Sequence, residues 1–152
     1  MNYCFYESPL GILRIEEEKE NIVRLTRDTR RSEEGWEYLS PLLQDAVRQL
    51  QEYFQGKRKN FDLPLAPHGT DFQKKAWKVL LSIPYGETIS YGEEAKRTGS
   101  GCPRAVGQAN GKNPIAIMIP CHRVVRGDGN LGGYTGGLDM KQFLLALERQ
   151  YR

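Results

Sequence analysis

The stretch Ala66-Pro67-His68-Gly69 divides the sequence into two halves with different hydrophobic patterns. Proline fixes the backbone and glycine frees it, so such a cluster between patterned segments is typical of a linker. Before it, short β-branched runs predict strands. After it, apolar residues recur mostly at helical spacing. We therefore expect two small domains, residues 1–67 and residues 68–152.

The first half predicts a small antiparallel sheet followed by one helix. Short runs rich in Ile, Val and Tyr, separated by turn sequences, predict strands over Tyr3–Tyr6, Ile12–Glu16 and Asn21–Thr26. Ser40-Pro41 is typical of a helix start and Gly56 of a helix end. Phe61–Leu65 predicts one more extended segment. The predicted fold class is therefore α+β.

The second half predicts a mainly helical, winged-helix-like domain that contains a helix-turn-helix. Thr70-x-x-Gln73 and Ser90-x-x-Glu93 are capping-box patterns, and each opens a helix. The second helix runs to about Thr98, and a glycine-containing turn separates it from a short helix over Pro103–Asn110. Helix, short turn and helix is the helix-turn-helix plan, although many helical domains contain such a corner.

The remainder of this half predicts a buried strand, a loop and a last helix. The apolar run Ile115–Ile119 ends at Pro120 and predicts an extended segment that brings Cys121 to the edge of the core. Residues 126–137 contain six glycines and predict a loop. Leu138–Glu148 returns to helical spacing.

The cysteines and histidines are too few and too scattered for a disulfide framework or a metal site. There are three cysteines and two histidines, and none has C-x-x-C or H-x-x-x-H spacing. Reduced thiols suit a cytosolic or nuclear compartment. No apolar run has membrane-spanning length, and the first residues lack a signal-peptide pattern. We expect a cytoplasmic protein, nuclear in a eukaryote, with no metal and no membrane contact.

The net charge is distributed unevenly along the chain. Residues 1–67 carry 10 Lys+Arg and 12 Asp+Glu, a net of −2, whereas residues 68–152 carry 12 and 7, a net of +5. A basic C-terminal half favours a nucleic-acid partner. An ordinary solvated surface is an equally good interpretation of a charge this small.

Pro120-Cys121-His122-Arg123 is the motif that carries chemistry. The thiolate is the nucleophilic form of cysteine, and neighbouring basic or cationic groups raise its fraction. A buried run that leads into Cys-His-Arg provides such a setting, with a basic ring and a fixed cation near the thiol. On the tetrapeptide alone, an inert core cysteine is an equal alternative, because free cysteine is often buried.

Two other segments suggest a flat or narrow partner. Gly127-x-Gly129-x-x-Gly132 has the dinucleotide-binding spacing, but no helix opens there, so that function is rejected. These glycines would let the backbone pass close to a flat ligand, or simply form a surface loop. In the helix over residues 103–110, Ala105 and Gly107 would allow close approach to a groove, with Arg104 as a probe. Close packing in the core favours the same small residues.

These motifs occur together in one order, and this order strongly resembles the O6-alkylguanine-DNA alkyltransferase family. The close match covers about Thr70 to Glu148, whereas residues 1–67 resemble the family only in the Ser8-Pro9-Leu10-Gly11 turn and the strand-then-helix order. The matching segments are Ile89-Ser90-Tyr91, Pro103-Arg104-Ala105-Val106-Gly107, Asn113-Pro114, Ile119-Pro120-Cys121-His122-Arg123-Val124-Val125, Gly133-Tyr134-Thr135-Gly136-Gly137-Leu138, Lys141 and Glu148.

The resemblance implies a catalytic group built around one cysteine. Cys121 corresponds to the alkyl acceptor, and His122 to the base that helps form its thiolate through a water. Glu148 would orient His122, the usual order of nucleophile, base and orienter. Tyr91 would donate to guanine N3, which makes the base a better leaving group. Asn113 would tie the second helix of the helix-turn-helix, over Pro103–Asn110, to the segment that carries the cysteine.

The resemblance also implies a set of residues that bind DNA and the extruded base. Arg104 would intercalate where the base was, and Tyr134 would form an aromatic wall beside the base. The backbone around Thr135 and the Val124 carbonyl would read the base edges, and Lys141 would support this loop. Ala105, Gly107 and Arg123 complete the implied DNA-binding set. Gly136 is small, so we hypothesise that the pocket also accepts a benzyl group.

The implied reaction is direct-reversal repair of O6-alkylguanine and, less well, O4-alkylthymine, in double-stranded DNA. The target atom lies inside a duplex, so the nucleotide must flip out, at a cost of about a few kcal/mol. In the family, the helix-turn-helix enters the minor groove. Transfer gives a thioether that no later step reverses, so each molecule acts once, as a monomer and without a cofactor. Some relatives bind structural zinc in the N-terminal domain, but Cys4 and His68 alone cannot make a four-ligand site.

Three other functions predict features that differ from those of this sequence. A non-catalytic relative that only senses lesions would lack the acceptor cysteine, whereas this sequence keeps Cys121. A helix-turn-helix transcription factor would not need Cys121, His122 and Glu148 together. A cysteine hydrolase would turn over repeatedly, and adjacent Cys and His residues are poorly placed for direct proton transfer.

Overall fold

The computed structural model describes residues 1–27, 35–128, 130–134 and 136–152. The chain divides into two compact units, Met1–Pro67 and His68–Arg152. The first is a sheet with one helix and the second is mainly helical, so the predicted α+β fold class is confirmed. Within the described ranges, no helix is long and apolar enough to span a membrane.

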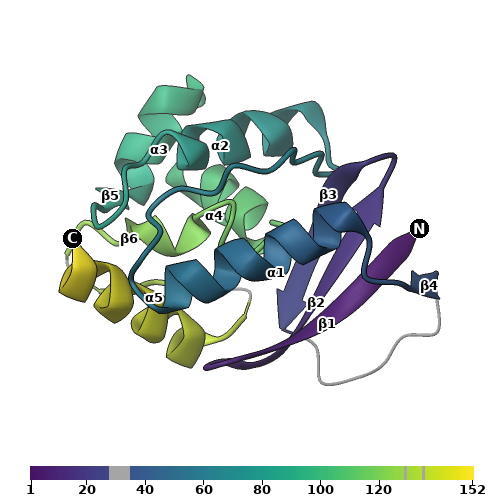
Figure 1. Ribbon diagram of the computed structural model, residues 1–152. Coiled ribbons are helices and arrows are strands. Elements are labelled where there is room, and N and C mark those ends of the chain that lie inside the picture. Colours follow the sequence, from purple (N-terminus) through teal and green to yellow (C-terminus); the bar gives the residue numbers. More distant parts are fainter. Residues whose placement is uncertain (28–34, 129, 135) are drawn as a thin grey trace. The chain divides into compact units, whose positions relative to one another are not determined.

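The first unit contains a four-stranded sheet in the order β3-β2-β1-β4 (Figure 1). Strands β1 (Asn2–Ser8), β2 (Gly11–Glu18) and β3 (Asn21–Arg27) form an antiparallel meander. The sequence did not predict β4 (Trp36–Glu37), which pairs with β1 in parallel. A two-residue edge strand lacks a run long enough to show period-two alternation.

Helix α1 (Pro41–Phe54) packs against this sheet, and its start is set by local sequence. The Ser40 hydroxyl accepts a hydrogen bond from Leu43 N–H, and Pro41 occupies the first helical position. Leu43, Ala46, Leu50 and Tyr53 form the buried face. The chain leaves the helix through Gly56, whose φ is +75°.

The segment predicted as extended over Phe61–Leu65 does not form a regular strand. Only Leu65 forms an isolated parallel bridge with Ile22. Pro64 has no N–H to donate to a ladder. The Asp62 N–H instead donates to the Gln49 side chain at 2.8 Å, so a side chain takes the place of a neighbouring strand.

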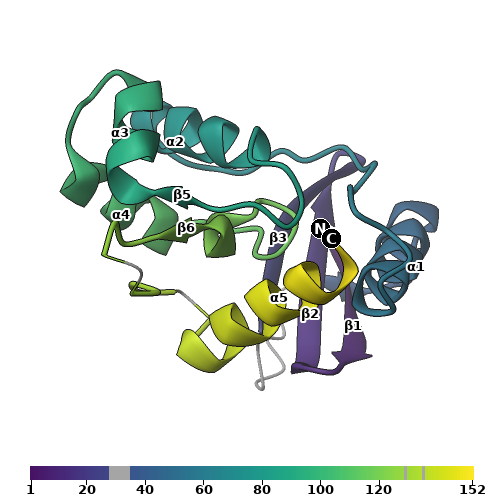
Figure 2. The same ribbon diagram turned by 90° about the vertical axis from the view of Figure 1, so that its left-hand side faces the viewer.

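The second unit opens with α2 (Asp71–Leu81), and the predicted capping box is present at Thr70 and Gln73. Helices α3 (Tyr91–Thr98) and α4 (Pro103–Gly111) form the predicted helix-turn-helix corner (Figure 2). Gly99, at φ +80°, ends α3 in the left-handed conformation that glycine adopts readily. The buried Trp77 indole on α2 donates to the Ala109 carbonyl of α4 at 2.8 Å and fixes the corner.

The predicted box at Ser90 is only half present. The Ser90 hydroxyl accepts from Glu93 N–H at 3.0 Å and caps α3. The Glu93 carboxylate instead accepts from Arg97 at 3.1 Å, one helical turn further on. The cap therefore depends on Ser90 alone.

Cys121 lies in a 3₁₀ turn, η1 (Cys121–Arg123), that precedes a two-residue strand. That strand, β6 (Val124–Val125), pairs in parallel with β5 (Ile89–Ser90), a pairing the sequence did not predict (Figure 2). Helix α5 (Leu138–Tyr151) follows the glycine-rich loop and extends three residues beyond the predicted end at Glu148.

The segment Ile115–Ile119, predicted as extended, is a buried series of turns. Ile117 has φ +71°, and Ile119 N–H donates back to the Ile115 carbonyl at 3.0 Å. The Asn113 amide takes further backbone groups, because its oxygen accepts from Ile115 N–H and its nitrogen donates to the Ile119 carbonyl. An apolar run indicates burial, but it does not distinguish a strand from a turn whose polar groups are satisfied locally.

Candidate active site

Cys121 is buried directly after Pro120, and its sulfur is held by one amide. The Asn113 Nδ2 donates to Cys121 Sγ at 3.2 Å and to the Ile119 carbonyl at 2.8 Å. One side chain thus fixes both the thiol and the backbone that leads to it. Asn113 lies two residues beyond the end of α4, so this contact joins the end of the second helix of the helix-turn-helix to the cysteine.

Burial raises the pKa of the Cys121 thiol to about 11, although the Asn113 hydrogen bond and the Lys141 charge lower it in part. The thiol is therefore protonated at neutral pH, and a proton acceptor is needed before it can attack. The expectation that Arg123 supplies a cation to the thiol is wrong. Arg123 and His122 both turn to Glu148 instead.

Glu148 on α5 is the centre of a buried network. Its Oε2 lies 2.6 Å from His122 Nε2, and the Arg123 guanidinium donates to both of its oxygens at 2.8 and 3.0 Å. Arg123 also donates to the Ile83 carbonyl at 2.8 Å, and Gly86 N–H donates to Glu148 at 3.1 Å. Arg123, predicted among the DNA-binding residues, is thus an interior residue that holds the Glu148 carboxylate.

The network fixes the charges of its members. Burial would raise the pKa of Glu148, but the hydrogen bond from His122 and the hydrogen bonds and charge of Arg123 hold it well below its usual value. Burial lowers the pKa of His122 despite Glu148, so the ring is neutral. A carboxylate only accepts hydrogen bonds, so the His122 proton lies on Nε2. Nδ1, which has no hydrogen-bond partner among the described residues, is left as the basic nitrogen.

Lys141 on α5 holds the glycine-rich loop. Its fully buried ammonium donates to the carbonyls of Val124, at 2.7 Å, of Gly133, at 3.2 Å, and of Leu131. These three bonds fasten β6 and the loop to one helix. The Lys141 side chain thus supports the loop, as the family resemblance implies. The Val124 carbonyl, which was expected to read a base edge, already accepts one hydrogen bond from Lys141.

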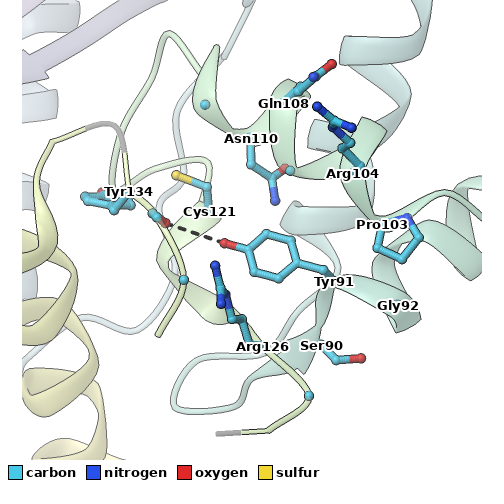
Figure 3. A pocket seen from close by; sticks show the side chains of 15 residues that line it. Ser90, Tyr91, Gly92, Pro103, Arg104, Gln108, Asn110, Cys121, Arg126 and Tyr134 are labelled. Carbon is cyan, nitrogen blue, oxygen red and sulfur yellow. Dashed lines mark hydrogen bonds between the residues drawn. The ribbon is translucent and has the colours of Figure 1, made fainter. Parts of the chain in front are cut away.

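A pocket of about 900 Å³ opens beside the cysteine (Figure 3). Residues from four parts of this unit line it: the β5–α3 junction, α4, the cysteine turn and the glycine-rich loop. They are Ser90, Tyr91, Gly92, Pro103, Arg104, Gly107, Gln108, Asn110, Gly111, Cys121, Arg126, Gly127, Gly132, Gly133 and Tyr134. The volume falls within the usual range for small-molecule sites.

One of the two glycines beside Tyr91, Gly132, is needed to keep the pocket open there. A Cβ on Gly132 would lie 2.7 Å from the Tyr91 hydroxyl, and the φ of +74° there would also strain any other residue. A Cβ on Gly107 would make ordinary contact with the Tyr91 ring, at 3.8 Å. The hydroxyl donates to the Gly133 carbonyl at 3.5 Å. Gly132 therefore allows the backbone of the glycine-rich loop to pass close to the Tyr91 side chain.

Some predicted residues lie outside this pocket. Ala105 lines a second hollow, with Phe72 and Gln73 of α2, rather than the pocket beside Cys121. Gly136 is not among the lining residues, and a Cβ on it would lie 2.5 Å from Met140 Sδ, so the structural basis for the benzyl hypothesis is removed. Thr135 lies outside the described residues.

The structure adds lining residues that the sequence analysis did not single out. Asn110 points into the pocket, and its Nδ2 donates to the buried Glu94 carboxylate on α3 at 2.7 Å. Arg126 points into the pocket from the loop (Figure 3). Recognition of either residue from sequence would have required the β5–β6 pairing and the α3–α4 packing. Within the described residues, no group of three metal-ligating side chains is close enough to hold a metal ion.

Comparison with known proteins agrees with this geometry. The model of the 6-O-methylguanine DNA methyltransferase DNA-binding domain matches residues 71–150, and that of the same family's ribonuclease-like domain matches residues 1–67. Methylated-DNA–protein-cysteine methyltransferase of Methanosarcina acetivorans is 48% identical, covering 97% of this chain and 98% of the relative. The constitutive enzyme of Bacillus subtilis is 46% identical, covering 97% and 94%.

Solved structures show the same similarity. The crystal structure of Mycobacterium tuberculosis OGT in complex with DNA has a TM-score of 0.91 and 45% identity, covering 99% of this chain and 94% of that one. An O6-methylguanine DNA methyltransferase from Methanococcus jannaschii has a TM-score of 0.71 and 32% identity, covering 95% and 92%. The chain therefore belongs to the 6-O-methylguanine DNA methyltransferase family.

Proposed function

We propose that this chain is a methylated-DNA–protein-cysteine methyltransferase that moves the alkyl group of O6-alkylguanine in DNA onto Cys121, once and irreversibly. The observation that carries the proposal is a thiol that lines a pocket of about 900 Å³ and is followed directly by His122, which is paired with the buried Glu148. The names of the relatives support the same reaction.

The charges of the network explain how a thiol with a pKa of about 11 becomes a nucleophile. The thiol proton passes, through a water, to the free Nδ1 of His122. The imidazolium that forms is stabilised by Glu148, which remains ionised because the Arg123 charge lowers the pKa of its carboxyl group. The sulfur then attacks the alkyl carbon in line with the departing oxygen. The product is a thioether, so the thiol is not regenerated.

The leaving group is guanine, and Tyr91 is the group that assists its departure. Its hydroxyl faces the same pocket as Cys121, so one flipped base can meet both (Figure 3). Donation of a proton to guanine N3 removes the charge that would otherwise build on the base. Tyr134, also at the pocket, forms a wall beside the base.

The helix-turn-helix presents the DNA-binding surface of the proposal. Arg104 is exposed on the first turn of α4 at the pocket, where its side chain can replace the extruded base. The minor groove is only ~6 Å wide, and α4 carries the small residues Ala105 and Gly107 that suit a narrow groove. A relative solved in complex with DNA supports DNA as the partner. We further propose that the chain acts as a monomer.

The test is the intact mass of the protein after mixing with a duplex that contains one O6-methylguanine. We expect one methyl group per molecule, mapped to Cys121 and absent from Cys121→Ala. Cys102→Ala is the matched control, because Cys102 is an exposed thiol outside the pocket lining, and it should accept the methyl group normally. Tighter binding to the lesion duplex without an adduct would instead indicate a lesion sensor.

A further inference from the structure

Arg126 and Tyr91 leave the short β5–β6 ladder side by side. The ladder pairs Ile89 with Val124 and Ser90 with Val125, and its strands are parallel. Tyr91 and Arg126 are the next residues on the two strands, so they emerge at the same end. The Arg126 N–H donates to the Asn130 carbonyl at 2.8 Å, which fixes the backbone from which its side chain extends.

The Arg126 guanidinium points into the pocket, toward the hydroxyl end of Tyr91 (Figure 3). None of the carboxylates in the described ranges pairs with it. Asp128, the nearest acidic residue along the chain, accepts instead from the backbone and the side chain of Asn130, at 3.0 and 3.1 Å. The pocket therefore contains a positive charge that no carboxylate of the described residues neutralises.

Other charged groups around Tyr91 have different effects. Burial, Cys121 and Glu94 raise the pKa of Tyr91, whereas Arg126 lowers it. The Lys141 ammonium lies 5.7 Å from the centroid of the Tyr91 ring, but it is engaged by three carbonyls. Arg126 is thus the cation that favours release of the Tyr91 proton.

We propose that Arg126 is a positioning residue that acts through Tyr91, by holding a positive charge beside the hydroxyl that gives its proton to the departing guanine. This proposal rests on the proposed alkyl transfer. The Arg126 charge makes the tyrosine a better acid at the moment when the base leaves.

A sulfur electron pair forms the S–C bond, while the electrons of the C–O bond move to guanine. Guanine takes the Tyr91 proton at N3, and the phenolate that remains faces the Arg126 guanidinium. The Cys121 proton is by then on His122, and solvent returns it to Tyr91 afterwards. No oxidant, reductant or cofactor enters.

The first measurement is the single-turnover rate of methyl transfer from a duplex with one O6-methylguanine. Arg126→Gln should transfer at least about tenfold more slowly, since preorganised charges at such sites are worth this much or more. Arg126→Lys should recover most of the rate, because it keeps the charge. Arg149→Gln removes an exposed positive charge from α5 outside the pocket lining and should match the unchanged protein.

The second measurement separates action through Tyr91 from DNA binding or folding. In O6-methyl-3-deazaguanine, a C–H replaces N3, so the base has no atom to take the Tyr91 proton. On this substrate, Arg126→Gln and the unchanged protein should react at the same rate. Likewise, Arg126→Gln should cause no further loss in a Tyr91→Phe background. An equal slowing on both bases, or no slowing on O6-methylguanine, would overturn the proposal. Absence of any transfer by the unchanged protein would overturn the proposed function itself.

Discussion

His122 Nε2 and Glu148 Oε2 lie 2.6 Å apart in the interior, and this contact determines which imidazole nitrogen can accept a proton. The carboxylate holds the ring proton on Nε2, so Nδ1 is left as the base. Arg123 keeps the carboxylate ionised with two hydrogen bonds of its own. The residues on either side of His122 therefore have separate roles: Cys121 reacts, and Arg123 keeps the Glu148 carboxylate ionised.

Glu148→Gln should impair both activity and stability. Methyl transfer should slow by on the order of a hundredfold, because the imidazolium loses its counter-charge. Unfolding free energy should fall by about 3–5 kcal/mol, because a buried Arg123 is left without its carboxylate. Rapid-quench transfer assays and urea unfolding measure the two effects. The control is Glu93→Gln, which breaks a partly exposed pair with Arg97 and should cost less than ~1 kcal/mol.

Acid should destabilise the protein through the same network. The pKa of His122 is lowered on folding, so stability is lost as the pH falls below about 6.5, where the unfolded chain binds the proton. The pKa of Glu148 is also lowered from its usual 4.5, so its contribution is complete above about pH 4.5 and is lost as the pH falls further toward its folded value. Urea unfolding at a series of pH values checks this. A Glu148→Gln protein with the same loss of stability below pH 4.5 would contradict the assignment.

Glu94 should have the opposite pH dependence. Burial raises its pKa from the usual 4.5 to about 7, although the Asn110 hydrogen bond lowers it in part. Its contribution is therefore favourable below pH 4.5 and is lost as the pH rises through about 7. Glu94→Gln, which keeps an acceptor for Asn110, should be more stable than the unchanged protein at pH 8, by about 1–3 kcal/mol, and similar to it at pH 4. A difference that does not vary with pH would refute this account.

Lys141→Met should loosen the glycine-rich loop without removing the thiol. The change leaves the carbonyls of Val124, Leu131 and Gly133 without their shared donor, and a lost hydrogen bond to a charged group costs about 1.5–3 kcal/mol. Hydrogen exchange in the loop should accelerate, and methyl transfer should slow. Lys96→Met, on the exposed side of α3, is the matched control and should change neither. Unchanged exchange in the Lys141 variant would show that the loop is held by other contacts.

The sequence by itself determined the features that depend on near neighbours. The caps at Ser40, Thr70 and Ser90 were predicted because each hydroxyl binds a backbone N–H only three residues away. The α+β fold class and the family followed from patterns and motifs that also lie close together along the chain. The His122–Glu148 pairing was available only from the resemblance, since the two residues are 26 positions apart.

Tertiary structure decided the arrangements that join distant segments. Arg123 was expected to face DNA, but the carboxylate 25 residues later draws it inward, because a buried carboxylate requires a counter-charge. Ile115–Ile119 became turns because the Asn113 amide satisfies backbone groups that a strand would have paired. Arg126 reaches the pocket because β6 pairs with β5, which lies some 35 positions earlier in the register of Ile89 with Val124. A two-residue strand has too little pattern to reveal its partner, so only the folded chain shows which side chains share the site.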